Sequence, residues 1–185
     1  MSTTTKEDSR RTVYLMGDEI ARQWTEDQRA AWSGFVAVSA LLKRDHNREL
    51  EATHGLSISM VGLLGRLAAA EHHVMRLTDL AERTGLSLSR VSRIVDLLER
   101  RELLNRVRCP SDGRAINAQL SDVGLETARA AQTTLRNAVQ RDFFDALDGE
   151  DVRALASAFE LLLGRIDPSA DPEEIVGRGD SCDSE

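Results

Sequence analysis

A short segment in the middle of the chain constrains the fold more than any other feature. Counting from Leu77 as the first position, Ala81 is fifth and Gly85 is ninth. Val91 and Ile94 follow at the fifteenth and eighteenth positions. A small residue lets two helices approach, glycine tolerates the left-handed backbone of a tight turn, and spaced apolar residues hold the second helix in place. The spacing therefore predicts a helix-turn-helix.

The second helix of this motif is expected to differ in chemistry between its two faces. Ser87 has the position and the side chain of an N-cap. The motif should bury four apolar residues, Leu80, Leu88, Val91 and Ile94. The outer face should carry Ser89, Arg90, Ser92 and Arg93. Hydroxyl and guanidinium groups suit the base edges and phosphates of a DNA major groove, so these four residues and Ser87 are predicted DNA contacts. A solvated charged face is the alternative interpretation.

A β-hairpin is predicted directly after this motif. Two β-prone stretches, 104–109 and 115–120, flank a turn at residues 110–113. Three arginines, Arg106, Arg108 and Arg114, fall near the predicted tip. A hairpin in this place is a wing, which can lay arginine into the neighbouring minor groove of DNA.

Long helices are predicted on both sides of the winged motif. One spans Glu26 to Glu51, with Gly55 in the turn that follows and Ser57 or Ser59 capping the next helix. Another spans Ser121 to about Leu147, after which Asp148 and Asp151 form an imperfect capping box for a final helix. The fold class is mainly α with a small β-wing, a winged helix-turn-helix with long N- and C-terminal dimerisation helices.

These elements divide the chain into three parts. Residues 1–25 form an N-terminal extension, within which 11–22 have weak helical periodicity. Residues 26–166 form the winged helix-turn-helix domain, and its DNA-binding core is 76–120. Residues 167–185 are rich in proline, glycine and acidic residues, which predicts a disordered tail.

The charge of the chain is unevenly distributed. The whole sequence has a net charge of −7. The segment 76–118 holds nine arginines and six acidic residues, whereas the rest of the chain holds 15 basic and 25 acidic residues. Because DNA binding depends on the local field, the acidic total does not exclude DNA as a partner. A structural helical bundle, the alternative class, would explain the long helices but neither the wing nor the local positive charge.

Several other classes of protein lack support. No apolar run approaches the roughly 20 residues of a membrane span, and no signal-peptide core begins the chain, so a cytoplasmic location without a membrane partner is expected. Two cysteines, Cys109 and Cys182, form neither a disulfide framework nor a metal motif. No nucleophile elbow, phosphate-binding glycine loop or zinc-protease motif is present, so we expect neither an enzyme nor a cofactor.

The run TDLAERTGLSLSRVSRIVDLLERRELLNR, the turn CPSDGRA and the helix start LSDVG resemble the MarR family of bacterial transcriptional regulators. The resemblance spans about Glu26 to Ile166. It implies a homodimer joined by N- and C-terminal helices that binds a palindromic operator in double-stranded DNA. It also implies repression that a small aromatic or anionic ligand releases. By the same resemblance, Asp112 orients a neighbouring arginine and Arg114 enters the minor groove.

The resemblance places an effector pocket between the dimerisation helices and the winged motif. The candidate ligand-binding residues are Trp32, Phe35, His46 and Arg66. Core packing is the alternative for the two aromatic residues, and a surface position is the alternative for His46 and Arg66. Hydroperoxide-sensing members carry a cysteine near the start of the first long helix, which this chain lacks. Gly62 stands where urate-responsive members carry an aspartate, and the four histidines do not form an obvious metal-ligand set.

Overall fold

A computed structural model describes residues 23–109 and 112–167, with the side chains of 109–115 left outside the description. The predicted helix within 11–22 and the predicted disordered tail fall outside these ranges and stay predictions. No helix within the two ranges is long and apolar enough to cross a lipid bilayer.

The first long helix and its successor begin and end at local sequence features. Helix α2 spans Glu26–His54, three residues further than predicted, and Thr25 caps it in a capping box with Gln28. Gly55 ends α2 in the left-handed region, with φ of 65°. Helix α3 spans Ile58–Ala69, and the Ser57 side chain accepts the Met60 backbone N–H. Of the two predicted caps, Ser57 is therefore the one that the chain uses.

The helix-turn-helix forms as the spacing predicts. Helix α4 spans Leu77–Thr84, helix α5 spans Leu88–Glu99, and Ser87 is the N-cap of α5. Gly85 lies between them with φ of 64°, a conformation that glycine adopts without steric cost. One prediction for this motif is wrong, because the Leu88 side chain is 49% exposed and does not join the core.

The wing belongs to a three-stranded antiparallel sheet with strand order β1-β3-β2. Strand β2 spans Leu104–Cys109, and β3 spans Asp112–Leu120, which begins three residues before the prediction. A register shift interrupts the pairing between Arg108 and Cys109. Strand β1, Val74–Arg76, pairs with β3 and follows a 3-10 turn at Glu71–His73, η2. It was missed because three residues carry too little periodicity to identify a strand.

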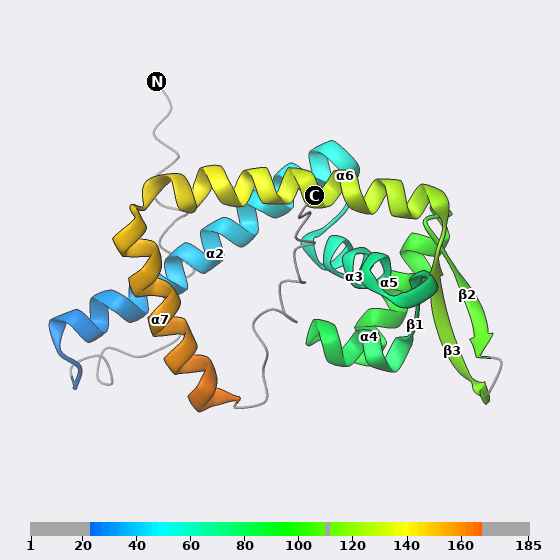
Figure 1. The fold of residues 1–185 in the computed structure, drawn as a ribbon, viewed down its shortest axis with the longest axis horizontal. Coiled ribbons are helices and arrows are strands. Elements are labelled where there is room, and N and C mark those ends of the chain that lie inside the picture. The colour runs from blue at the N-terminus through cyan, green and yellow to red at the C-terminus, as the bar shows by residue number, and fades with distance from the viewer. Residues whose placement is uncertain (1–22, 110–111, 168–185) are drawn as a thin grey trace, which may run out of the picture.

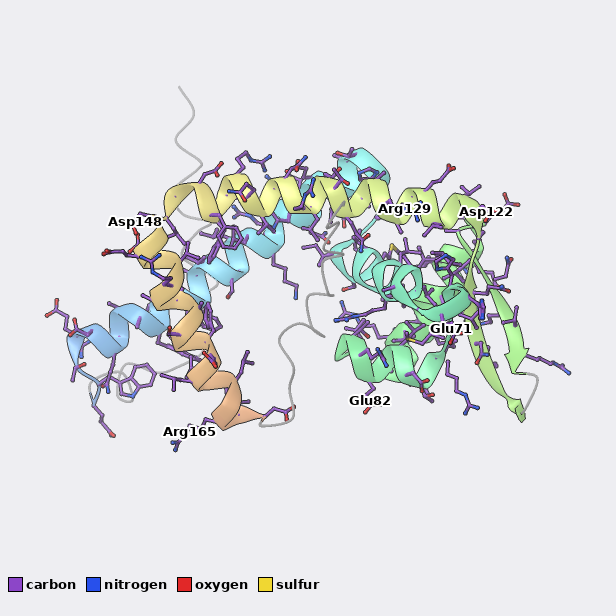
Figure 2. All side chains as sticks on the ribbon, in the orientation of Figure 1. Glu71, Glu82, Asp122, Arg129, Asp148 and Arg165 are labelled. Carbon is purple, nitrogen blue, oxygen red and sulfur yellow. The ribbon has the colours of Figure 1, made fainter. Side chains whose placement is uncertain are left out.

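The C-terminal half is two helices joined at a sharp bend. Helix α6 spans Asp122–Asp142, a 3-10 turn spans Phe144–Ala146 (η3), and helix α7 spans Gly149–Ile166. The predicted end of the second long helix at Leu147 is too late, because the backbone leaves the helical region at Phe143. Asp148 caps α7, with both hydrogen bonds of the capping box to Asp151 present, and it lies at the bend in Figure 2.

The core lies on one side of the molecule. Helices α3, α4, α5 and the sheet gather at the right in Figure 1, under one end of α6, while α7 and the start of α2 lie at the left. Most fully buried residues come from the first group and from α6, and they include Leu64, Leu67, Leu80, Val91, Val95, Leu98, Leu104 and Ala131. Helix α7 buries no residue, and α2 buries only His46 and Leu50. The winged half, made of α3, α4, α5 and the sheet, is therefore a packed unit. The other half, made of α7 and the start of α2, leaves much apolar surface uncovered.

Candidate nucleic-acid interface

The N-terminal half of α5 presents polar and basic side chains to solvent. Ser89, Arg90 and Arg93 are all exposed. Ser87 accepts the backbone N–H of Arg90, which fixes the first turn of the helix. The Arg90 guanidinium reaches across to α3 and donates to Ser59 Oγ at 3.4 Å. Arg93 is exposed, and its guanidinium offers up to five donors.

Ser92 lies at the edge of this face, beside the wing. Its side chain is half-buried, and Arg106 Nη2 donates to its backbone carbonyl at 3.1 Å and to its Oγ at 3.4 Å. A hydroxyl engaged in this way is held against strand β2. The structure thus brings together four of the predicted α5 contacts but turns Ser92 partly toward the sheet.

Arg106 was expected near the tip of the wing, and this expectation is wrong. The residue lies in the middle of β2, paired with Ala118, and its side chain is only 23% exposed. Arg106 Nη1 lies 2.6 Å from Asp96 Oδ1 and 2.7 Å from Glu99 Oε2, both on α5. The wing strand therefore places one positive charge against the two carboxylates that α5 carries near its basic face, which halves their net charge.

The same contacts set the ionisation of Glu99. The Arg106 backbone N–H donates to Glu99 Oε1 at 2.9 Å, and the guanidinium donates to Oε2. These bonds, led by the backbone one, hold the pKa of Glu99 below its ordinary value. The ionised form of Glu99 is therefore favoured by its contacts with Arg106.

The outer part of the wing carries the remaining predicted contacts. Arg108 is exposed and lies at the register shift that ends the regular pairing of β2 with β3. Asp112 and Arg114 lie in β3, and their side chains fall outside the described part of the structure. Their roles in DNA binding stay predictions.

Arg101 is a structural residue that sequence reasoning missed. It follows α5, and its guanidinium donates to the carbonyls of Gly55 at 2.7 Å and His54 at 2.9 Å. These carbonyls lie at the C-terminus of α2, where the helix dipole favours a cation. His54 Nε2 in turn lies 2.8 Å from Thr134 Oγ1 on α6. The C-terminal end of α5 is thereby tied to both long helices, α2 and α6, and no local pattern in the sequence indicates this.

The predicted effector residues do not converge on one small site. Trp32 and Phe35 are 45% and 51% exposed, with ring centroids 6.0 Å apart, and Phe35 lies 6.4 Å from Phe159 on α7. His46 lies eleven residues after Phe35 on α2, which is about 16 Å along the helix. Arg66 is half-buried on α3. The aromatic pair and His46 therefore occupy separate regions of α2.

His46 is not at the surface, which was the alternative to ligand binding considered for it. Its side chain is buried, and Nε2 lies 3.2 Å from Asp142 Oδ2 at the end of α6. The described residues include no group of three or more histidines, cysteines and carboxylates that could hold a metal ion.

Known proteins resemble this chain in sequence and in fold. The sequence model described as the MarR family matches residues 54–115. AbsC, a MarR family transcriptional regulator from Streptomyces coelicolor, is 31% identical with a TM-score of 0.71, over 77% of this chain and 96% of that chain. Sco3205, a MarR family transcriptional regulator from the same organism solved in complex with DNA, is 29% identical with a TM-score of 0.73, over 79% and 91%.

More distant structures share the fold alone. MepR from S. aureus, solved as a DNA complex, is 20% identical with a TM-score of 0.65, over 77% of this chain and 98% of that chain. No curated protein sequence is significantly similar to this chain.

Proposed function

We propose, starting from the fact that this chain belongs to the MarR family of transcriptional regulators, that it is a DNA-binding repressor. It binds a palindromic operator in double-stranded DNA as a homodimer, and a small aromatic or anionic effector releases it. It acts by binding rather than by catalysis, and it works in the cytoplasm.

The observation that carries this proposal is the exposed face of α5. Arg90 and Arg93 stand beside serine hydroxyls on a helix whose own carboxylates, Asp96 and Glu99, are paired with Arg106. The face is therefore basic although the chain is acidic. The N-terminal residues of a recognition helix are those that reach base edges in the major groove. The DNA present with Sco3205 supports the same kind of ligand for this chain.

The uncovered half of the molecule supports the homodimer. Apolar side chains on α2 and α7 are exposed although they recur on helix faces, namely Trp32, Phe35, Val38, Leu41, Phe159, Leu161, Leu162 and Ile166. Such surface is costly in water and is ordinarily buried against a partner. A second copy related by a two-fold axis would cover it and would place two α5 helices on one DNA duplex.

The proposed effector contacts come from α2 and α3. Trp32 and Phe35 lie in the surface that the second copy would cover, so a flat aromatic ligand that stacks on them would lie at that interface. Arg66 supplies a cation on α3 for an anionic group.

The test measures binding of DNA duplexes selected by the full-length protein from a random-sequence library. Arg93→Ala should weaken binding of the selected duplex by roughly 1–3 kcal/mol per half-site and relax the preferred sequence. Arg90→Ala should do the same. Arg129→Ala, which removes another exposed arginine, from α6, is the control (Figure 2). If Arg90→Ala and Arg93→Ala both bind the selected duplex as tightly as wild type and as Arg129→Ala, DNA binding belongs to another surface.

A further inference from the structure

Leu88, the first residue of α5, is exposed where the helix pattern places a core residue. Its side chain is 49% exposed, whereas Val91 and Val95 on the same helix are fully buried. Leu86, two residues earlier, takes the core position and packs against the buried cluster. Leu88 therefore projects beyond the end of the core, as side chains at a helix N-terminus do because they tilt toward that end.

The surroundings of Leu88 belong to the proposed DNA-binding face. It lies between Ser87 and Ser89, whose hydroxyl oxygens are 3.2 Å apart, and it precedes the exposed Arg90. An apolar side chain among hydroxyls and guanidinium groups breaks the polar character of this face. A leucine has no donor or acceptor, so it cannot bind a phosphate or the polar edge of a base.

We propose that Leu88 is a specificity-determining residue that packs against the C5-methyl group of a thymine in the major groove. This inference rests on the proposed function and names one base that the operator must contain. The thymine methyl is the apolar group that the base pairs display in that groove, and apolar side chains recognise it by contact. Leu88 occupies the helix end that approaches base edges. Cytosine lacks the methyl group, so each half-site should prefer thymine where Leu88 contacts it.

The same helix offers a matched control. Leu97 is 41% exposed, nearly as much as Leu88, but it lies nine residues later, about 13 Å along α5. If Leu88 did not contact DNA, its replacement should change DNA binding no more than replacement of Leu97 does. The comparison of the two leucines therefore separates base contact from ordinary surface exposure.

The experiment uses the full chain and duplexes selected from a random-sequence library. Wild-type protein and Leu97→Ala should select the same sequences, with one fixed thymine in each half-site. Leu88→Ala should lose the preference at that position and keep the others. Leu88→Gln should change the preference toward adenine, because the glutamine amide pairs with the adenine edge. Thermal unfolding of each variant verifies that it is folded.

A single methyl group provides the decisive measurement. Replacing the selected thymine by deoxyuridine removes only that methyl, and should weaken wild-type and Leu97→Ala binding by about fourfold per half-site. Leu88→Ala should bind both duplexes equally. Equal binding of the two duplexes by wild type, or a loss in Leu88→Ala as large as in wild type, would overturn the inference. If wild type selects no preferred sequence at all, the proposed function itself fails.

Discussion

At the scale of single residues, the charge that α5 presents depends on Arg106. Without this residue, Asp96 and Glu99 would stand beside Arg90 and Arg93 on one helix, and the local field toward DNA would be close to neutral. One guanidinium from β2 binds both carboxylates and the Ser92 carbonyl. It therefore joins the wing to the recognition helix and offsets one of the two negative charges that would repel phosphate.

Arg106→Met should weaken DNA binding although Arg106 need not touch DNA. Methionine keeps the apolar stem but frees both carboxylates, so affinity for selected and scrambled duplexes should fall together. Stability should fall by about 1 kcal/mol, a modest loss because both carboxylates are more than a third exposed. Adding Asp96→Asn and Glu99→Gln should restore much of the affinity. Fluorescence anisotropy measures the binding, and an unimproved triple variant would contradict the electrostatic explanation.

Residue roles were predictable where they depend on local spacing and not where they depend on packing. Ser87 and Gly85 follow from cap and turn chemistry, which acts over three or four residues. Leu88 and Arg106 were assigned wrongly because each depends on where the core ends and which strand passes the helix. The hairpin pattern in the sequence does not distinguish one arginine position from another. In the structure, however, the strand places Arg106 against α5 and leaves Arg108 exposed to solvent.

At the scale of elements, helix starts were predicted more reliably than helix C-termini or short strands. Thr25, Ser121 and Asp148 cap helices with their own side chains, so their positions can be read from the sequence. Strand β1 instead exists because β3 pairs with it, which is a non-local cause. The C-terminal end of α6 was also predicted too late, because the helix ends at Phe143 without a glycine or proline in the sequence to mark the change.

The start of α6 depends on a glycine that allows close packing. A Cβ at Gly124 would lie 1.8 Å from the Leu103 backbone carbonyl oxygen, so Gly124→Ala must displace backbone. We expect a loss of roughly 1–3 kcal/mol in the free energy of unfolding, measured by urea denaturation. Gly62→Ala on α3 is the control, because a Cβ there meets nothing within 4 Å, and alanine should be neutral or stabilise the helix by about 0.5–1 kcal/mol. Equal effects of the two substitutions would contradict the close approach.

The junction of α2 and α6 should respond to acid. A hydrogen bond from Arg141 is the main cause that lowers the pKa of Asp142 below its ordinary 3.8, and His46 adds to it. A carboxyl whose pKa is lowered by folding contributes stability above its unfolded pKa, and this is lost as pH falls through the folded pKa. Asp142→Asn should therefore be less stable than wild type at pH 7.

The difference between Asp142→Asn and wild type should shrink in acid, where Asp142 is protonated as well. Urea midpoints measured from pH 7 down to about 3 would follow this convergence. Glu126→Gln, which alters an exposed carboxylate of the same helix, is the control. A gap that stays constant with pH would show that the Asp142 charge does not stabilise the junction.

At the scale of the whole molecule, the two halves differ in packing and in charge. The winged half holds the core and the basic segment, whereas α7 buries nothing within a single chain. Helix α7 exposes Leu161 and Ile166, each 77% accessible, and burying them against a partner would stabilise it. We therefore expect a dimer at micromolar concentration in sedimentation velocity, and we expect Leu161→Asp to shift it toward monomer.

The geometry of such a dimer dictates how it reads an operator. Two α5 helices related by a two-fold axis should enter the major groove about one helical turn apart, so half-site centres lie about 10 base pairs from each other. Inserting about five base pairs between the half-sites moves one to the opposite face of the duplex, and binding should then fall to that of a single half-site. Inserting about ten base pairs returns both half-sites to the same face of the duplex and should recover part of the affinity.

The Leu161→Asp variant should bind all three duplexes alike, because a monomer does not sense the spacing between half-sites. If wild type binds the duplex with the insertion of about five base pairs as tightly as the original duplex, the two-fold arrangement is contradicted. If wild type is a monomer and still binds the operator tightly, dimerisation is not required for binding.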